Sequence, residues 1–149
     1  MQNSIEKTIE LTSPIARVWR AVTDHQEFGE WFRVKLDGPF AVGEISRGQI
    51  TYPGYEHMKW EATVQAMEPE RLFSFTWCPY EGDPDTDDQS EYLTLVEFKL
   101  EPTSTGTRLI VTESGFSALP DEPRRAEALR RNTGGWDAQA KNIAVYVDV

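Results

Sequence analysis

The chain has 149 residues, which predicts a single domain, spanning 1–149, with a core large enough to need no metal or disulfide. Hydrophobic residues make up 39% and charged residues 27% of the sequence, which is typical of folded globular proteins and excludes a disordered chain. The 25 acidic residues outnumber the 15 Lys and Arg, and the resulting net charge of −10 disfavours binding to nucleic acid. The longest apolar run, residues 143–147, is far too short for a membrane span, so we expect no membrane insertion.

Cysteine content and the first residues bear on the cellular location. Cys78 is the single cysteine, so neither an intramolecular disulfide nor a thiolate metal site can form. Residues 1–7 contain neither the basic nor the apolar stretch of a secretory signal. We therefore expect a cytoplasmic location.

The first part of the chain predicts a strand followed by two short helices. Residues 5–11 place their apolar side chains on one face, which indicates a strand. Ser13 is expected to cap a helix with Pro14 at its first position. Asp24 is expected to cap a second short helix that ends near residues 31–32.

The middle of the chain predicts an antiparallel sheet with one apolar face. Apolar and polar side chains alternate along these segments, as where Trp60, Ala62 and Val64 are separated by polar residues. Gly, Pro and acidic residues separate the segments and indicate turns. The predicted strands are residues 43–51, 56–67, 71–78, 92–101 and 107–114.

Helical spacing of apolar residues returns after Pro123 and continues almost to the end of the chain. We expect Gly134 and Gly135 to interrupt this helix and to bend or loosen it. Trp136 follows directly and is expected to be the buried contact that keeps the helix on the sheet. The order of elements predicts an α+β fold whose helices cover one face of an antiparallel sheet.

Several segments resemble a known family in the order in which they occur, namely residues 18–24, 30–32, 60–64, 70–72, 113–116 and 135–136. The sequence is similar to the START/SRPBCC superfamily, in the branch that resembles the C-terminal domain of the activator of the heat-shock protein 90 ATPase. The resemblance implies the helix-grip fold of the birch pollen allergen, a curved sheet of about six strands wrapped on a long C-terminal helix. It also implies a cavity between sheet and helix that can hold an apolar small molecule.

An acidic segment, residues 81–91, has part of the pattern of a calcium-binding loop. Asp83, Asp85 and Asp87 have the spacing of its first three ligands. The position that requires Gly is Asp88, and the position that requires a bidentate Glu is Thr94. We therefore expect a solvated acidic loop between two strands and no metal site. Neither the residues nor the resemblance indicates a cofactor.

Glu113 is the one candidate for a catalytic residue. It shares strand parity with Leu109 and Val111, which points its carboxyl group inward, and Glu97 has a similar environment if its strand contains a bulge. In an apolar cavity the pKa of Glu113 would be raised, and the group could act as a general acid or base or hydrogen-bond a ligand. Alternatively, Glu113 pairs with an arginine or caps the turn at Gly115.

Aromatic rings dominate the predicted inner face of the sheet, opposite small residues of the final helix. Ligand pockets are commonly lined in this way, although the same rings could form a plain core. The predicted ligand-binding residues are Trp60, Phe73, Phe75, Trp77, Phe98, Val111, Glu113, Trp136 and Ala140.

These observations favour a cytoplasmic, non-catalytic protein that binds an apolar or aromatic small molecule. One alternative is a cyclase- or hydrolase-type enzyme that uses Glu113, although no nucleophile elbow or other catalytic constellation is present. The other is a protein-binding module, by resemblance to the chaperone activators, with residues 81–91 as its most marked surface.

Overall fold

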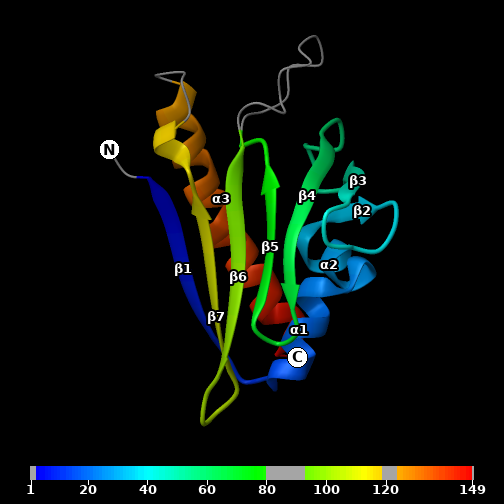
Figure 1. The fold of residues 1–149 in the computed structure, drawn as a ribbon, viewed down its shortest axis with the longest axis vertical. Helices are drawn as coiled ribbons and strands as arrows, with labels where there is room; N and C mark the ends of the chain where they lie inside the picture. Colours follow the sequence, from blue (N-terminus) through cyan, green and yellow to red (C-terminus); the bar gives the residue numbers. More distant parts are fainter. Residues whose placement is uncertain (1–2, 80–92, 119–123, 149) are drawn as a thin grey trace.

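The computed structural model describes residues 3–79, 93–118 and 124–148. Within these ranges the chain forms one antiparallel sheet whose strands follow the order β1-β7-β6-β5-β4-β3-β2, so that β1 and β2 are the edges. The helices lie on one face of this sheet, and the long helix α3 crosses behind the strands in Figure 1. The predicted acidic loop, residues 81–91, lies outside the described residues.

The helices and strands occur in the expected chain order. The first three elements are β1 (Ser4–Leu11), α1 (Ile15–Thr23) and α2 (His25–Phe32). The next strands are β2 (Val34–Leu36), β3 (Ile45–Ile50), β4 (Lys59–Glu68) and β5 (Leu72–Trp77). They are followed by β6 (Thr94–Pro102), β7 (Thr107–Ser114), the 3-10 helix η2 (Phe116–Ala118) and α3 (Arg124–Val147).

The predicted helix-grip α+β fold is confirmed, with seven strands in the described sheet where about six were expected. The additional strand is β2, which pairs with β3 from Val34 to Leu36. Three residues are too few to show an alternating pattern, so the sequence carried no signal for this edge strand. Gly29 of α2 allows the close approach, because a Cβ there would lie 2.3 Å from the carbonyl oxygen of Val34.

The two short helices begin in different ways. Asp24 caps α2 as predicted, because its carboxylate accepts hydrogen bonds from the backbone N–H groups of Gln26 and Glu27, both at 3.0 Å. The prediction that Ser13 caps α1 is wrong. The N-cap residue is Pro14, which has no side chain able to accept a hydrogen bond.

Ser13 instead joins the start of α1 to the end of α3. Its hydroxyl oxygen lies 2.5 Å from the backbone carbonyl oxygen of Val147 and 2.8 Å from Asp148 Oδ1, so its single proton lies between two acceptors. The same carboxylate accepts hydrogen bonds from the backbone N–H groups of Thr12 and Ser13, each at 3.1 Å. The last turn of α3 is thereby fixed to the connection between β1 and α1.

The long helix α3 is continuous, so the expectation that the glycine pair interrupts it is wrong. Gly134 and Gly135 are exposed, neither has a positive φ, and a Cβ at either would meet nothing within 4 Å. They occupy the solvent side of the helix. The buried residues of α3 are Ala128, Trp136, Ile143 and Val147.

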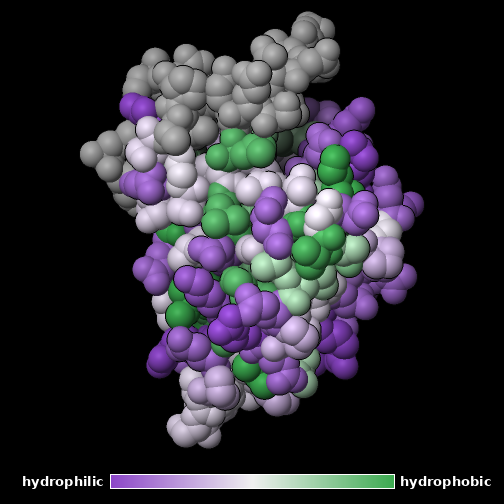
Figure 2. Space-filling model, in the orientation of Figure 1, coloured by the Kyte–Doolittle hydropathy of each residue, from purple (hydrophilic) through white to green (hydrophobic). Residues whose placement is uncertain are grey.

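None of the described helices covers the opposite face of the sheet. Figure 2 shows this face, on which hydrophilic and hydrophobic residues are mixed and the hydrophilic ones predominate. This distribution is typical of an antiparallel sheet with one solvated side. Within the described residues, no helix combines the length and the hydropathy needed to cross a membrane.

Candidate functional site

Glu113 lies on the inner face of β7, one residue before the strand ends. Its register neighbours are Ile5 of β1 and Val96 of β6. The side chain is completely buried, at 0% exposure. Charged residues are rarely buried to this extent unless their polar atoms have partners, so the surroundings of the carboxylate require an explanation.

Five hydrogen bonds from four neutral side chains of the described residues surround the carboxylate of Glu113. Its Oε2 accepts from Trp77 Nε1 at 2.9 Å and from Thr94 Oγ1 at 2.6 Å. Its Oε1 accepts from Trp136 Nε1 at 2.8 Å. Asn132 Nδ2 lies 3.1 and 3.2 Å from the two oxygens. We call these four residues and Glu113 the carboxylate network.

The sequence left two structural roles open for Glu113, an ion pair with an arginine and a cap on the turn at Gly115. The carboxylate network is found in place of both. In the described part of the chain no Lys or Arg forms an ion pair with this carboxylate, and its donors do not include the turn at Gly115. The donors come from β5, β6 and α3, so one acceptor joins three elements. Proton transfer by Glu113 would first require one of these donors to move away.

Glu97 lies on the opposite face of the sheet from Glu113. The pairing of β6 with β5 and with β7 is continuous, so no bulge turns this residue inward. Its carboxylate accepts a long hydrogen bond of 3.4 Å from Thr112 Oγ1.

The predicted aromatic residues are brought together in one cluster. Phe73, Phe75 and Phe98 are fully buried and pack on one another with ring centroids 5.8–6.1 Å apart. The ring of Trp136 lies 5.9 Å from that of Phe98 and 5.8 Å from that of Trp77. Trp60 completes the predicted set, 5.4 Å from Phe75.

Helix α2 contributes aromatic rings that the sequence analysis did not place in this cluster. Phe28 is fully buried and its ring lies 5.6 Å from that of Trp60, while the ring of Phe32 lies 6.2 Å from that of Trp77. These rings occupy space that was predicted to hold a ligand. The larger part of the predicted lining is therefore packed core in this structure.

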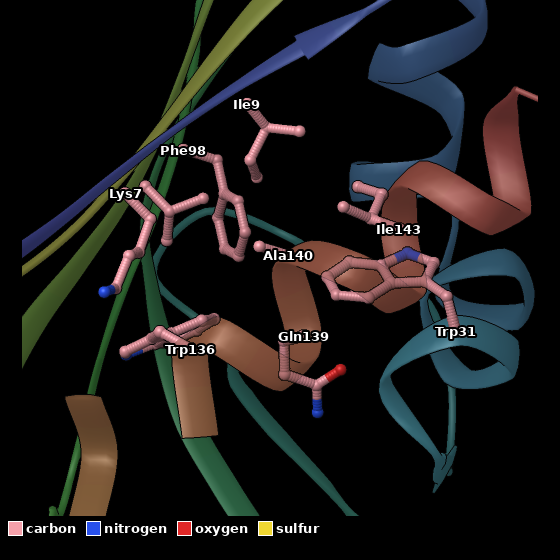
Figure 3. Close-up of a pocket in the computed structure, with 9 residues that line it drawn as sticks. Lys7, Ile9, Trp31, Phe98, Trp136, Gln139, Ala140 and Ile143 are labelled. Atoms are coloured by element: carbon pink, nitrogen blue, oxygen red, sulfur yellow. The ribbon is translucent and has the colours of Figure 1, made fainter. Parts of the chain in front are cut away.

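A small pocket remains between β1 and α3 (Figure 3). Its volume is about 10 Å³, close to what one water molecule requires. Four predicted residues line it, namely Phe98, Val111, Trp136 and Ala140. The remaining predicted residues, Trp60, Phe73, Phe75, Trp77 and Glu113, do not.

Five further residues line the pocket and were not predicted: Lys7, Ile9, Trp31, Gln139 and Ile143. In Figure 3, Lys7 and Ile9 reach the pocket from the sheet, Trp31 from α2, and Gln139 and Ile143 from α3. A signal for Lys7 was present, because strand parity puts it on the same face as Ile9. Trp31 carried no comparable signal, since only the packing of α2 on α3 brings it here.

Two polar contacts border the pocket. Lys7 Nζ lies 2.7 Å from Asp137 Oδ1, so an ion pair joins the edge strand β1 to α3. The side chain of Lys7 is 27% exposed and that of Asp137 is 57% exposed. Gln139 Nε2 donates to the backbone carbonyl of Phe32 at 3.0 Å and joins α3 to α2.

The sheet, the order of its strands and the long C-terminal helix that it encloses define a protein of the START/SRPBCC helix-grip class. Residues 12–148 match the model of the family described as activator of Hsp90 ATPase homolog 1-like protein. The chain belongs to this family. No curated protein gives a significant match to the sequence.

Solved structures of similar proteins share the fold. Protein MLL2253 from Mesorhizobium loti is 27% identical, with a TM-score of 0.76, over 97% of this chain and 96% of that chain. DynU16 from the dynemicin biosynthetic locus is 21% identical, with a TM-score of 0.76, over 100% of this chain and 48% of that chain. The Aha1 dimer from Colwellia psychrerythraea is 15% identical, with a TM-score of 0.71, over 99% and 98%. The last two similarities concern the fold alone.

Proposed function

We propose that the protein binds a small apolar or aromatic molecule between the sheet and α3, at the pocket beside β1. The observation that carries this proposal is the pocket itself. Its walls include the rings of Trp31, Phe98 and Trp136, and α3 also contributes the small side chain of Ala140 together with Gln139 and Ile143. Apolar walls with a few polar groups at the border are the usual composition of a small-molecule site.

The pocket must enlarge to admit a molecule of this kind, and its border suggests how. The Lys7–Asp137 ion pair is partly exposed, and pairs of this type contribute little to stability. Rotation of the aliphatic stem of Lys7 away from α3, with its ammonium group kept at the border, would open the space between β1 and α3 and add the volume of the stem.

The backbone of α3 beside the pocket supports the same view. Gly134 and Gly135 contribute no side-chain contacts there and disfavour the helical conformation by about 1 kcal/mol each relative to Ala. The C-terminal half of the helix is fixed by Asp148 and by Tyr146, whose hydroxyl lies 2.6 Å from Glu30 Oε2. A small displacement of α3 near residue 135 would thus leave its end in place.

The two alternative functions receive less support. An enzyme using Glu113 would need a free carboxyl group, whereas this carboxylate accepts five hydrogen bonds. The protein-binding alternative depends on residues 81–91, which lie outside the described residues. We therefore propose neither.

Titration with 1-aminoanthracene, whose fluorescence rises in apolar surroundings, tests the proposal. We expect saturable binding to the parent protein. Ala140→Phe fills the pocket and is expected to weaken binding by at least about tenfold, or 1.4 kcal/mol. Ala138→Phe introduces the same ring at an exposed position of α3 and should bind like the parent. Absence of binding to the parent, or equal binding by Ala140→Phe, would contradict the proposal.

A further inference from the structure

Lys7 is a charged residue on the inner face of the sheet, and its position has a chemical consequence. It pairs in register with Val111 of β7, which in turn pairs with Phe98 of β6. All three line the pocket. The ammonium group of Lys7 therefore lies at the solvent-facing end of a line of side chains that continues through Val111 and Phe98 into the core.

From this position we infer that the pocket takes an aromatic or other apolar acid whose carboxylate pairs with Lys7. This inference rests on the proposed function and names the chemical class of its ligand. The apolar body would lie among Trp31, Phe98 and Trp136, and the acid group would remain at the border.

Asp137 shows that the ammonium group can be reached by a carboxylate. Its Oδ1 lies 2.7 Å from Lys7 Nζ, at the rim of the pocket and partly in solvent. A carboxylate on a bound molecule would take the place of Asp137 in the same ion pair. Because exposed pairs are weak, this exchange costs little, and a pair shielded from water by the ligand is stronger.

In the described part of the chain, the other charged and polar groups near the pocket cannot perform this role. Glu113 is enclosed by the carboxylate network and would repel an acid. The amide of Gln139 donates to the backbone of α2. Lys7 is therefore the group that would select between an acid and a neutral molecule of the same shape.

An inward lysine on an edge strand also has a structural explanation, since a charge there prevents edge-to-edge association of sheets. That explanation makes no distinction between acidic and neutral ligands. Comparison of 2-naphthoate with 2-naphthamide, which have the same ring system and similar size, therefore separates the two explanations.

The experiment measures displacement of 1-aminoanthracene by each naphthalene compound. We expect the parent to bind 2-naphthoate roughly two- to fivefold more tightly than 2-naphthamide, the range of a weak ion pair. Lys7→Met retains most of the aliphatic stem and should bind both equally. Lys35→Met removes an exposed lysine from the opposite edge strand β2 and should keep the preference.

A second variant, Asp137→Asn, removes the competing carboxylate and should tighten binding of 2-naphthoate without tightening that of 2-naphthamide. Equal affinities in the parent, a preference that survives Lys7→Met, or equal tightening of both compounds by Asp137→Asn would overturn the inference. If 2-naphthamide binds in any of those cases, the result would still support the proposed function, because an apolar molecule would then occupy the pocket. Failure of both compounds and of 1-aminoanthracene to bind would overturn the inference and the proposed function together.

Discussion

Glu113 shows how a carboxylate is accommodated in a core when its partners among the described residues are all neutral. Burial removes water from the carboxylate, and the two indole N–H groups, one hydroxyl and one amide of the carboxylate network take its place. Each of these donors would be left without an acceptor if the carboxylate were removed. The network therefore depends on the acceptor at its centre.

Glu113→Gln tests this dependence. One acceptor oxygen becomes an NH₂ group, which would face indole or amide N–H groups that need an acceptor. We expect the free energy of unfolding to fall by about 2–4 kcal/mol. Glu97→Gln makes the same change on the outer face of the neighbouring strand and should alter the free energy of unfolding by less than about 0.5 kcal/mol. Urea denaturation of both variants provides the comparison, and equal effects would show that the network contributes nothing specific.

Trp136 combines burial with a hydrogen bond to the same carboxylate. It is 4% exposed and packs against Phe98 and Trp77. Trp136→Ala removes both contributions, and we expect the free energy of unfolding to fall by about 3–5 kcal/mol. A urea midpoint within error of that of the parent would mean that Trp136 does not hold α3 on the sheet.

On the scale of secondary structure, α3 is held at its middle and at its last turn. Asn132 and Trp136 attach the middle through the carboxylate network, and Asp148 attaches the last turn. Gly134 and Gly135 lie between Asn132 and Trp136, and they weaken the helix there. The helix therefore has low intrinsic propensity at the level of the pocket, where the proposed function requires it to move.

Replacement of both glycines by alanine should stabilise the protein. The backbone at Gly134 and Gly135 is helical without a positive φ, and the added methyl groups meet no other atom within 4 Å. We expect a gain of up to about 2 kcal/mol in the free energy of unfolding, measured by urea denaturation. The reverse change at an exposed position, Ala138→Gly, should cost about 1 kcal/mol. A loss of stability in the double variant would show that the glycines are required by the fold.

The attachment of the last turn of α3 should depend on pH. Burial alone would raise the pKa of Asp148, but hydrogen bonds from Thr12 and Ser13 outweigh it and lower the pKa below its ordinary value of 3.8. Because the pKa of Asp148 is lower in the folded state than in the unfolded state, its charged form stabilises the folded protein at pH values above the ordinary pKa. This stabilisation is lost as the pH falls through the pKa of the folded state.

Asp148→Asn should therefore be less stable than the parent at pH 7, with a difference that narrows as the pH is lowered below about 4. Thermal melts followed at pH 7 and at pH 3 measure this difference. A difference of the same size at both values would show that the charge of Asp148 is not involved.

For the molecule as a whole, the sequence predicted the fold more completely than the site. Alternation in five segments and an apolar stripe after Pro123 were sufficient for the sheet and α3. The direction of Glu113 also followed from strand parity. Its donors did not, because they come from three elements that only tertiary packing brings together, although Asn132 stands four residues before Trp136 and so on the same helix face.

The size of the interior could not be predicted from the strands and α3 alone. It depends on Phe28 and Phe32 of α2, whose rings occupy the space between the sheet and the helices. The end of α2 and its cap at Asp24 could be predicted from the sequence, but the orientation of the helix could not. Lys7 was not predicted for a different reason: it shares strand parity with Ile9, but a charged residue is not part of the apolar pattern that defines an inner face.

The central claim is that an aromatic molecule enters beside β1, and indole N–H signals in a ¹H–¹⁵N correlation spectrum test it most directly. Trp31 and Trp136 line the pocket, whereas Trp60 is buried with its Nε1 donating to Ser46 Oγ, and Trp19 lies on α1. On addition of 1-aminoanthracene we predict that the signals of Trp31 and Trp136 shift and saturate together, while those of Trp19 and Trp60 stay in place. Unchanged signals of Trp31 and Trp136 at saturating probe, or shifts confined to Trp19, would contradict the account.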